Sequence, residues 1–366
     1  ARPIRLGGDE FAVLLERVDH HQALAAAQRL LIAVNASFAF SRGTISLSAS
    51  IGLMHASEAR GTLDLMRDAD VAMYRAKADG KNRIVTFEPA MQARVARRLR
   101  LETELRRSVD NGDFALHYQP LVDLETLEVV GAEALLRWRH PERGLLLPTA
   151  FVDIAEDTGL ILPLGRWVLE QAARDAAAWQ AVADRPFSVS ANLSPSQLHD
   201  PDLVAIIVAI LQDAALPPET LIVEITENLL LKDAELARSR LAALRSVGVR
   251  VAVDDFGTGY SSFAYLDRYP VDILKIDRSF VGSLGGRPRA AVLVRSILEL
   301  AQAFDLETVA EGIESTDQLR TLRSLGCRYG QGFRFAVPRP AEQITAMLES
   351  DSLAGMREQP AAESAA

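Results

Sequence analysis

The chain has 366 residues, which is too long for one average domain and predicts two or more folding units. Hydrophobic residues make up 49% of the chain and charged residues 24%, which is the balance of an ordinary soluble globular protein. The net charge of −9 argues against a general DNA or RNA binder, because such proteins carry a basic face.

The sequence also predicts the compartment. A single cysteine, Cys327, excludes an internal disulfide and indicates a reducing, cytoplasmic environment. No apolar stretch reaches the roughly 18 residues that a membrane helix needs, so we expect no membrane segment here. Because the chain opens without an initiator methionine, we interpret it as a piece of a longer protein, whose upstream part could carry a membrane anchor or a sensor.

We expect residues 1–88 to form a first folding unit. Apolar residues alternate on both sides of Gly7-Gly8, which indicates a β-hairpin. The stretch 89–112 is rich in Arg and Glu with sparse apolar positions at helical spacing, and it predicts a linker helix. The other patterns of the first unit are a helix, a strand and a second helix stopped by a glycine, at 20–34, 45–54 and 63–82.

From residue 113 to 350, strand patterns alternate with apolar helical patterns. Eight strand candidates with buried Val and Ile favour an α/β fold closed into a (β/α)8 barrel. A doubly wound open sheet is the alternative, but no G-x-G-x-x-G motif opens a helix. The small, polar tail 351–366 predicts disorder. The strand candidates are 114–124, 129–138, 187–194, 221–227, 249–256, 272–277, 307–314 and 329–335.

The strand candidate VAVDDF ends in two adjacent aspartates, and other strand candidates also end in acids or amides. In a barrel, the C-terminal ends of the strands meet at one mouth and build the active site. We therefore expect the polar side chains of these strand ends to converge. They are Glu133, Asn192, Glu224, Glu227, Asp254, Asp255, Lys275, Asp277, Glu311, Glu314 and Gln331.

Converging carboxylates repel each other and are costly to bury unless protons or cations neutralise them. Oxygen ligands without His or Cys favour Mg²⁺ or Mn²⁺ over Zn²⁺. Asp254 and Asp255 can lean toward two different ions, and paired ions roughly 3.5–4 Å apart are the usual device for in-line displacement at phosphorus. Lys275 could orient or help deprotonate an attacking water. The acids thus predict phosphoester hydrolysis, but they do not identify the substrate.

Seven motifs over about 97–345 resemble the EAL-domain family and occur in the family's order. The resemblance implies a modified TIM barrel whose first strand runs antiparallel. It also implies a homodimer and hydrolysis of the bacterial second messenger cyclic di-GMP to linear pGpG. The motifs are EALLRW (133–138), NLS (192–194), EITE (224–227), DDFGTGYSS (254–262), KID (275–277), AEGIE (310–314) and GQGF (330–333).

The resemblance implies a role for each matching residue. The ligands of two ions, with Asp254 bridging, would be Glu133, Asn192, Glu224, Asp254, Asp255 and Glu311. Lys275 and Glu311 would position and activate the nucleophilic water. The loop after the fifth strand would be supported by Glu227 and Glu314. The dinucleotide groove, where Arg137 would pair with a phosphate through its planar fork, would be lined by Gln119, Leu135, Arg137, Asp277 and Gln331.

Taken alone, several of these residues have simpler interpretations. Glu133 could be an ordinary salt-bridge partner, and Asn192 could cap a helix. Lys275 could serve only to neutralise a neighbouring acid, and Asp277 could form an ion pair with Arg278.

The first unit resembles the C-terminal half of the GGDEF family, diguanylate cyclases that join two GTP molecules. The resemblance rests on RLGGDEFAVLL, SASIGLM and DADVAMYRAKADGKNRI. The first half of such a domain would precede Ala1, so Asp9 and Glu10 lack the upstream metal aspartate and the nucleotide-contacting segment. We expect no cyclase activity from this truncated α+β unit, and GTP binding only at an intact GGDEF domain in a longer parent.

Three functions therefore stand side by side. They are a cyclic di-GMP phosphodiesterase, a catalytically silent cyclic di-GMP receptor and, in a full-length parent, a bifunctional cyclase/phosphodiesterase. Degenerate members of the EAL family lose a metal ligand or the lysine. None of these residues is lost here, which favours the phosphodiesterase.

Overall fold

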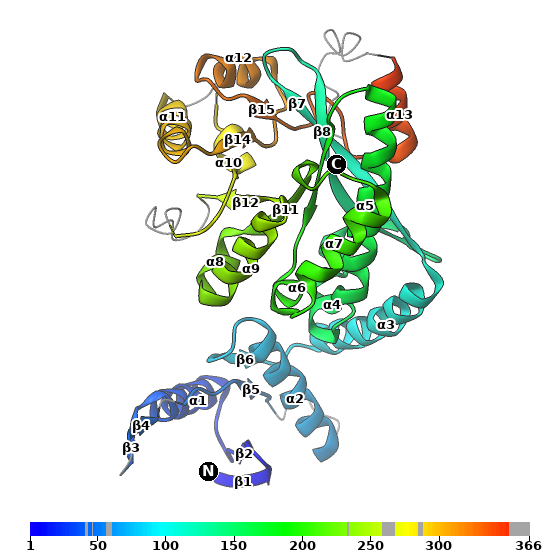
Figure 1. Ribbon diagram of the computed structural model, residues 1–366. Coiled ribbons are helices and arrows are strands. Elements are labelled where there is room, and N and C mark those ends of the chain that lie inside the picture. The colour runs from blue at the N-terminus through cyan, green and yellow to red at the C-terminus, as the bar shows by residue number, and fades with distance from the viewer. Residues whose placement is uncertain are drawn as a thin grey trace. The chain divides into compact units, whose positions relative to one another are not determined.

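Figure 1 shows the computed structural model of the chain, which describes residues 1–40, 43–45, 47–55, 61–232, 234–257, 268–284 and 288–350. The chain divides into two compact units, Ala1–Thr103 and Glu104–Ala366. The predicted tail 351–366 and the motif residues 258–262 lie outside the described residues. Among the described helices, none combines the length and the apolar character that crossing a membrane requires.

The first unit contains the predicted hairpin, in which β1 (Arg2–Gly7) pairs antiparallel with β2 (Glu10–Leu14). The single strand predicted over 45–54 is wrong. Its two ends belong to β4 (Gly43–Ile45) and β5 (Ile51–Leu53), which have different partner strands. The remaining elements of this unit are α1 (His20–Asn35), β3 (Phe38–Phe40), α2 (Thr62–Ala78) and β6 (Ile84–Thr86).

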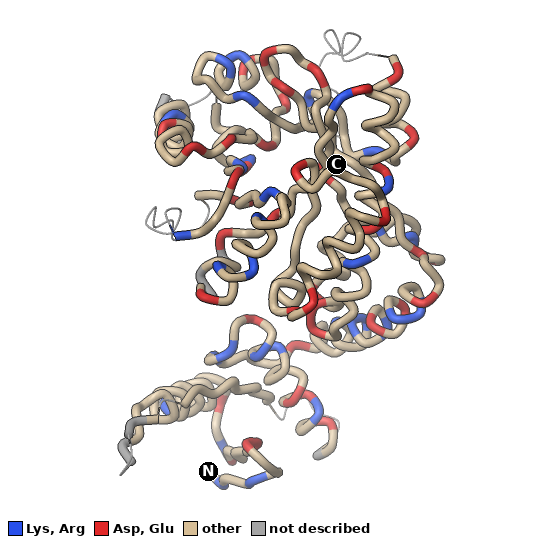
Figure 2. Tube along the Cα trace, in the orientation of Figure 1, with Lys and Arg blue, Asp and Glu red and all other residues tan. Residues whose placement is uncertain are grey.

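Helix α3 (Pro89–Asn111) covers the stretch predicted as a linker helix, and the division between the two units falls within it. Its C-terminal part is fixed to the barrel unit through Glu104. His140 Nδ1 accepts from the backbone N–H groups of Glu142 and Arg143, so its Nε2 donates to Glu104, at 3.1 Å. Figure 2 shows Lys and Arg positions interspersed with Asp and Glu along the helices.

Eight strands of the second unit form a closed ring, because β7 pairs with both β8 and β15. Strand β7 runs antiparallel to both of these neighbours, and the other neighbouring strands of the ring are parallel. The (β/α)8 barrel and its antiparallel first strand are thus confirmed. The ring strands are β7 (Phe114–Asp123), β8 (Val129–His140), β10 (Ser188–Asn192), β11 (Leu221–Thr226), β12 (Arg250–Phe256), β13 (Ile273–Ile276), β14 (Glu307–Ala310) and β15 (Tyr329–Gly330).

Helices surround the strand ring, and the main hydrophobic core lies between the helices and the strands (Figure 1). On α5, for example, the Trp179 ring packs edge-on against Tyr118 of β7, with 4.7 Å between ring centroids. The short strand β9 (Gly144–Leu146) pairs antiparallel with β8, and the short strand β16 (Arg339–Pro340) pairs antiparallel with β7. The helices are α4 (Val152–Thr158), α5 (Ile161–Ala183), α6 (Pro195–His199), α7 (Leu203–Ala214), α8 (Glu227–Lys232), α9 (Ala234–Ser246), α10 (Arg278–Val281), α11 (Pro288–Ala303), α12 (Thr316–Ser324) and α13 (Ala341–Glu349).

The last two ring strands are shorter than predicted. Strand β14 ends at Ala310 and β15 at Gly330. The predictions that these strands continue through 311–314 and 331–335 are therefore wrong. The two segments still bind each other, because Ile313 donates its N–H to Gln331 and accepts from the N–H of Arg334. Gly332, with φ +158°, lies in the turn that follows β15.

Core packing around β13 generates a stability prediction. Leu274 is fully buried, so Leu274→Ala leaves a cavity and should lower the free energy of unfolding by about 2–5 kcal/mol. The matched control is Leu293→Ala on α11, where the side chain is 45% exposed and the change should stay within about 0.5 kcal/mol. Urea unfolding followed by tryptophan fluorescence measures both, and equal losses would contradict the packing described.

Candidate metal and substrate site

The ammonium of Lys275 lies at the centre of the predicted cluster. Lys275 is the third residue of β13, and its side chain is only 3% exposed. Its Nζ lies 2.7 Å from Glu224 Oε2 of β11. It also lies 2.7 Å from Oε1 of Glu311, the residue just after β14. Asp254 Oδ1 of β12 lies at 3.3 Å and Glu133 Oε2 of β8 at 3.5 Å. One cation therefore contacts four acids from separate segments of the barrel.

Two amide side chains complete the contacts among these acids. Gln331, just after β15, donates through Nε2 to Glu133 Oε2 at 2.7 Å and to Glu311 Oε1 at 3.0 Å. Asn192, the last residue of β10, donates through Nδ2 to Glu133 Oε1 at 3.1 Å. The structure thus brings together predicted residues from β8, β10, β11, β12 and β13 and from the segments just after β14 and β15.

The two adjacent aspartates serve the same cluster because β12 is irregular at its end. Successive residues of a regular strand point to opposite faces. Here the register with β13 shifts between Val253 and Phe256, and Asp255 has φ +55°. As a result, carboxylate oxygens of Asp254, Asp255 and Glu311 all lie within 4.8 Å of one another. A bulge of this kind re-aims side chains next to active sites.

The crowding of acids changes their proton affinities. Burial, and then the negative charge of Glu133, raise the pKa of Glu224 well above its usual range. Burial also raises the pKa of Glu311, to about 7. For Lys275, burial lowers the pKa, but the four surrounding carboxylates raise it more, so the ammonium stays charged. The pKa of Asp255 is raised by burial and by the charges of Asp254 and Asp277.

The residues predicted to support the loop after β12 differ in burial. Glu227 is 2% exposed, and its Oε2 accepts the N–H of Gly257 at 3.2 Å. Gly257 has φ +93°, and an added Cβ would lie 2.8 Å from the ring of Phe280. The side chain of Glu314 is exposed, and its backbone N–H donates to Gln318 at 2.8 Å. The loop itself, 258–267, lies outside the described residues, so support by either acid stays a prediction.

The predicted groove residues lie near the same mouth, on β7 and β8. Gln119 pairs in register with Glu133 and donates to the backbone oxygen of Ala336. Arg137 is 6% exposed and donates through Nη1 to Leu136 O at 2.9 Å, while Leu135 is partly buried.

Asp277 has a structural role that sequence reasoning missed. Its Oδ1 accepts the N–H of Ser279 at 3.0 Å and so caps α10. The signal was present in the sequence, because Asp277 directly precedes a short helical stretch.

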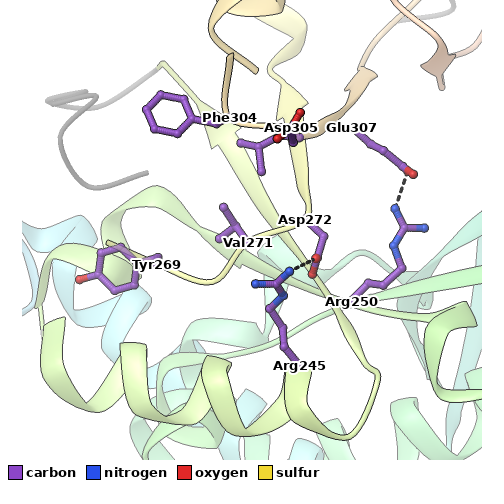
Figure 3. A pocket seen from close by; sticks show the side chains of 9 residues that line it. Arg245, Arg250, Tyr269, Val271, Asp272, Phe304, Asp305 and Glu307 are labelled. Carbon is purple, nitrogen blue, oxygen red and sulfur yellow. Dashed lines mark hydrogen bonds and ion pairs between the residues drawn. The ribbon is translucent and has the colours of Figure 1, made fainter. Parts of the chain in front are cut away.

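Two cavities lie in the barrel unit. One of about 200 Å³ runs inside the barrel below the cluster, from Glu224, Lys275 and Gln331 to Arg250 and Glu307. The other, of about 440 Å³, lies at the opposite, N-terminal ends of β12, β13 and β14. Figure 3 shows two ion pairs in its lining, Arg245 with Asp272 and Arg250 with Glu307. The larger cavity is therefore separate from the acid cluster.

A closed (β/α)8 barrel with polar groups gathered at the C-terminal strand ends has the architecture of a barrel enzyme. Within this class, the chain belongs to the EAL domain family, which matches residues 102–338. Residues 2–83 match the diguanylate cyclase GGDEF domain, so the tandem arrangement inferred from the motifs is confirmed.

Curated relatives match nearly the whole chain. MucR of Pseudomonas aeruginosa, named a bifunctional diguanylate cyclase/cyclic di-GMP phosphodiesterase, is 39% identical over 94% of this chain and 50% of its own length. PdeR of Escherichia coli, named a cyclic di-GMP phosphodiesterase, is 38% identical over 93% of this chain and 51% of its own length. The chain thus spans about half the length of these relatives.

Solved structures share the fold. The MucR phosphodiesterase in complex with c-di-GMP has a TM-score of 0.64 and 40% identity, and covers 67% of this chain and 99% of its own. The EAL enzyme Bd1971, bound to cAMP and cyclic di-GMP, has a TM-score of 0.67 and 32% identity, and covers 80% of this chain and 77% of its own.

The position of Lys275 predicts a large stability effect. Lys275→Met removes the cation that four acids share. In the absence of divalent ions, this substitution should lower the free energy of unfolding by about 3–5 kcal/mol. Urea unfolding in EDTA, followed by tryptophan fluorescence, measures the loss. Lys77→Met, on the exposed surface of α2, is the matched control and should change little. A Lys275 variant as stable as the control would refute the role of the ammonium.

Proposed function

We propose that this chain hydrolyses cyclic di-GMP to linear pGpG. The observation that carries the proposal is the acid cluster around Lys275 at the C-terminal mouth of the barrel. Membership of the EAL family and the names of the relatives MucR and PdeR supply the substrate. The single cysteine of the chain favours the cytoplasm as the place of this hydrolysis.

The donor set fits divalent ions that prefer oxygen. The cluster offers carboxylates and amides, with no His or Cys among its described members, and this favours Mg²⁺ or Mn²⁺. Two ions, when bound, would lower the pKa of a water and neutralise charge that develops on the phosphate. The residues that would hold them, with Asp254 shared, are Glu133, Asn192, Glu224, Asp254, Asp255 and Glu311.

The remaining side chains would bind the dinucleotide and handle the proton. Glu311 would help to activate the attacking water, as the EAL resemblance implies, because its carboxylate lies beside Lys275 in the acid cluster. Lys275 would hold the same water in place. Arg137 would pair with a phosphate, and the other groove residues would be Gln119, Leu135, Asp277 and Gln331.

The whole protein's partners extend the proposal. A second copy of the chain would form a homodimer through the barrel unit, as the EAL resemblance implies. GTP would bind at a complete GGDEF domain. In this chain, residues 2–83 match the GGDEF family, and the chain covers 50% of the length of the relative MucR.

Loss of one central acid tests the proposal. Asp254→Asn keeps the shape of the side chain and removes its charge, so turnover of cyclic di-GMP with Mg²⁺ should fall. The loss should exceed roughly 10–100-fold, which is the effect of removing a residue that only orients a metal ligand. Glu133→Ala should do the same. Liquid chromatography of the linear product measures turnover, and circular dichroism checks folding.

The matched control is Asp317→Asn on α12, whose carboxylate is 75% exposed, and it should keep full turnover. Turnover retained in Asp254→Asn would refute the assigned site. Tight binding of cyclic di-GMP by the unaltered chain, without any turnover in Mg²⁺ or Mn²⁺, would establish the silent receptor instead.

A further inference from the structure

A large aromatic side chain is exposed at the rim of the candidate site. Phe333 is 63% exposed, although it lies two residues after Gln331, which is 8% exposed and bonded to Glu133 and Glu311. Keeping a phenyl ring in water forgoes the stabilisation that burial would give. None of the groups assigned above to the site is aromatic.

The turn that carries Phe333 is held in one conformation. Gly332 has φ +158°, and a Cβ added there would lie 2.2 Å from the backbone nitrogen of Ile313. Ile313 donates its N–H to Gln331 O at 3.1 Å and accepts the N–H of Arg334 at 2.9 Å. The N–H of Phe335 closes the turn on Gly332 O at 3.0 Å. The backbone on both sides of Phe333 is thus fixed by hydrogen bonds, so its exposure follows from the fold.

Both ends of the turn are attached to residues of the predicted groove. On one side Gln331 bonds the acid cluster, and on the other Ala336 O accepts from Gln119 of β7. Glu133 and Gln119 are register partners in neighbouring strands. Phe333 therefore lies in a turn whose one end is bonded to the acid cluster and whose other end is bonded to β7, the strand expected to line the groove.

We propose that the ring of Phe333 is the stacking platform for one guanine base of the substrate. This inference rests on the proposed function and adds to it the recognition of the base. A purine presents a flat π-face, and an exposed aromatic ring held by a rigid turn can cover that face at little entropic cost. Base–aromatic stacking is worth roughly a 5- to 150-fold change in affinity per base.

The test compares three substitutions in the full chain. Phe333→Ala should raise the KM for cyclic di-GMP about tenfold and leave kcat within about twofold, since stacking acts on a part of the substrate that does not react. Phe333→Trp should keep the original KM, because it keeps a π-face. Phe333→Leu, which keeps apolar area without a ring, should behave like Phe333→Ala. The matched control is Phe11→Ala in β2, where the ring is 66% exposed in the first unit, and it should change neither parameter.

Three results would overturn the inference. An unchanged KM in Phe333→Ala shows that the ring does not meet the base. A loss of kcat at unchanged KM shows that the turn acts on the acid cluster instead. A full recovery by Phe333→Leu shows that apolar area alone is required.

A dissociation constant measured by calorimetry separates failure of this inference from failure of the proposed function. If the unaltered chain binds cyclic di-GMP without turnover, the hydrolytic proposal fails, and a tenfold weaker affinity in Phe333→Ala still supports stacking. If the unaltered chain neither binds nor hydrolyses cyclic di-GMP, both proposals fail.

Discussion

The structure of the site depends on one ammonium group shared by four carboxylates. Lys275 contacts acids that come from β8, β11, β12 and the segment after β14, and it is almost fully buried. Without that cation, the partners of these four acids among the described residues would be the amides of Gln331 and Asn192 and the backbone N–H of Asp255. Burying charge is tolerable when partners and hydrogen bonds compensate the lost hydration, and here Gln331 and Asn192 add those bonds. The acids still outnumber the cation, and the proposed divalent ions would neutralise this excess of carboxylates.

The barrel makes this convergence possible. Parallel neighbours place the C-terminal ends of β10 to β15 at one mouth, and the antiparallel β7 brings Gln119 beside Glu133. Closure of the ring fixes the strand register, so each acid keeps its distance from Lys275 through backbone pairing and core packing. The irregular end of β12 is the local exception, and it allows Asp254 and Asp255 to serve one cluster.

Much of this could be predicted from the sequence, for identifiable reasons. Buried strands alternating with helices predicted the barrel, and the acids at the strand ends predicted the cluster. The antiparallel β7 could come only from family resemblance, because apolar patterns carry no strand direction. The turn at Gly332 was missed because the contacts that fix it join Ile313 to residues far along the chain. For Asp277, the KID resemblance implied a place in the groove, while the same carboxylate also suits the N-cap of the short helix that follows.

We propose that the acids around Lys275 hold two divalent ions, and anomalous X-ray diffraction from crystals grown with Mn²⁺ would locate them. We expect two anomalous peaks at the C-terminal mouth, roughly 3.5–4 Å apart, with Asp254 between them. Crystals saturated with Mn²⁺ that show no anomalous peak within bonding distance of Asp254, Glu133 or Glu311 would contradict it.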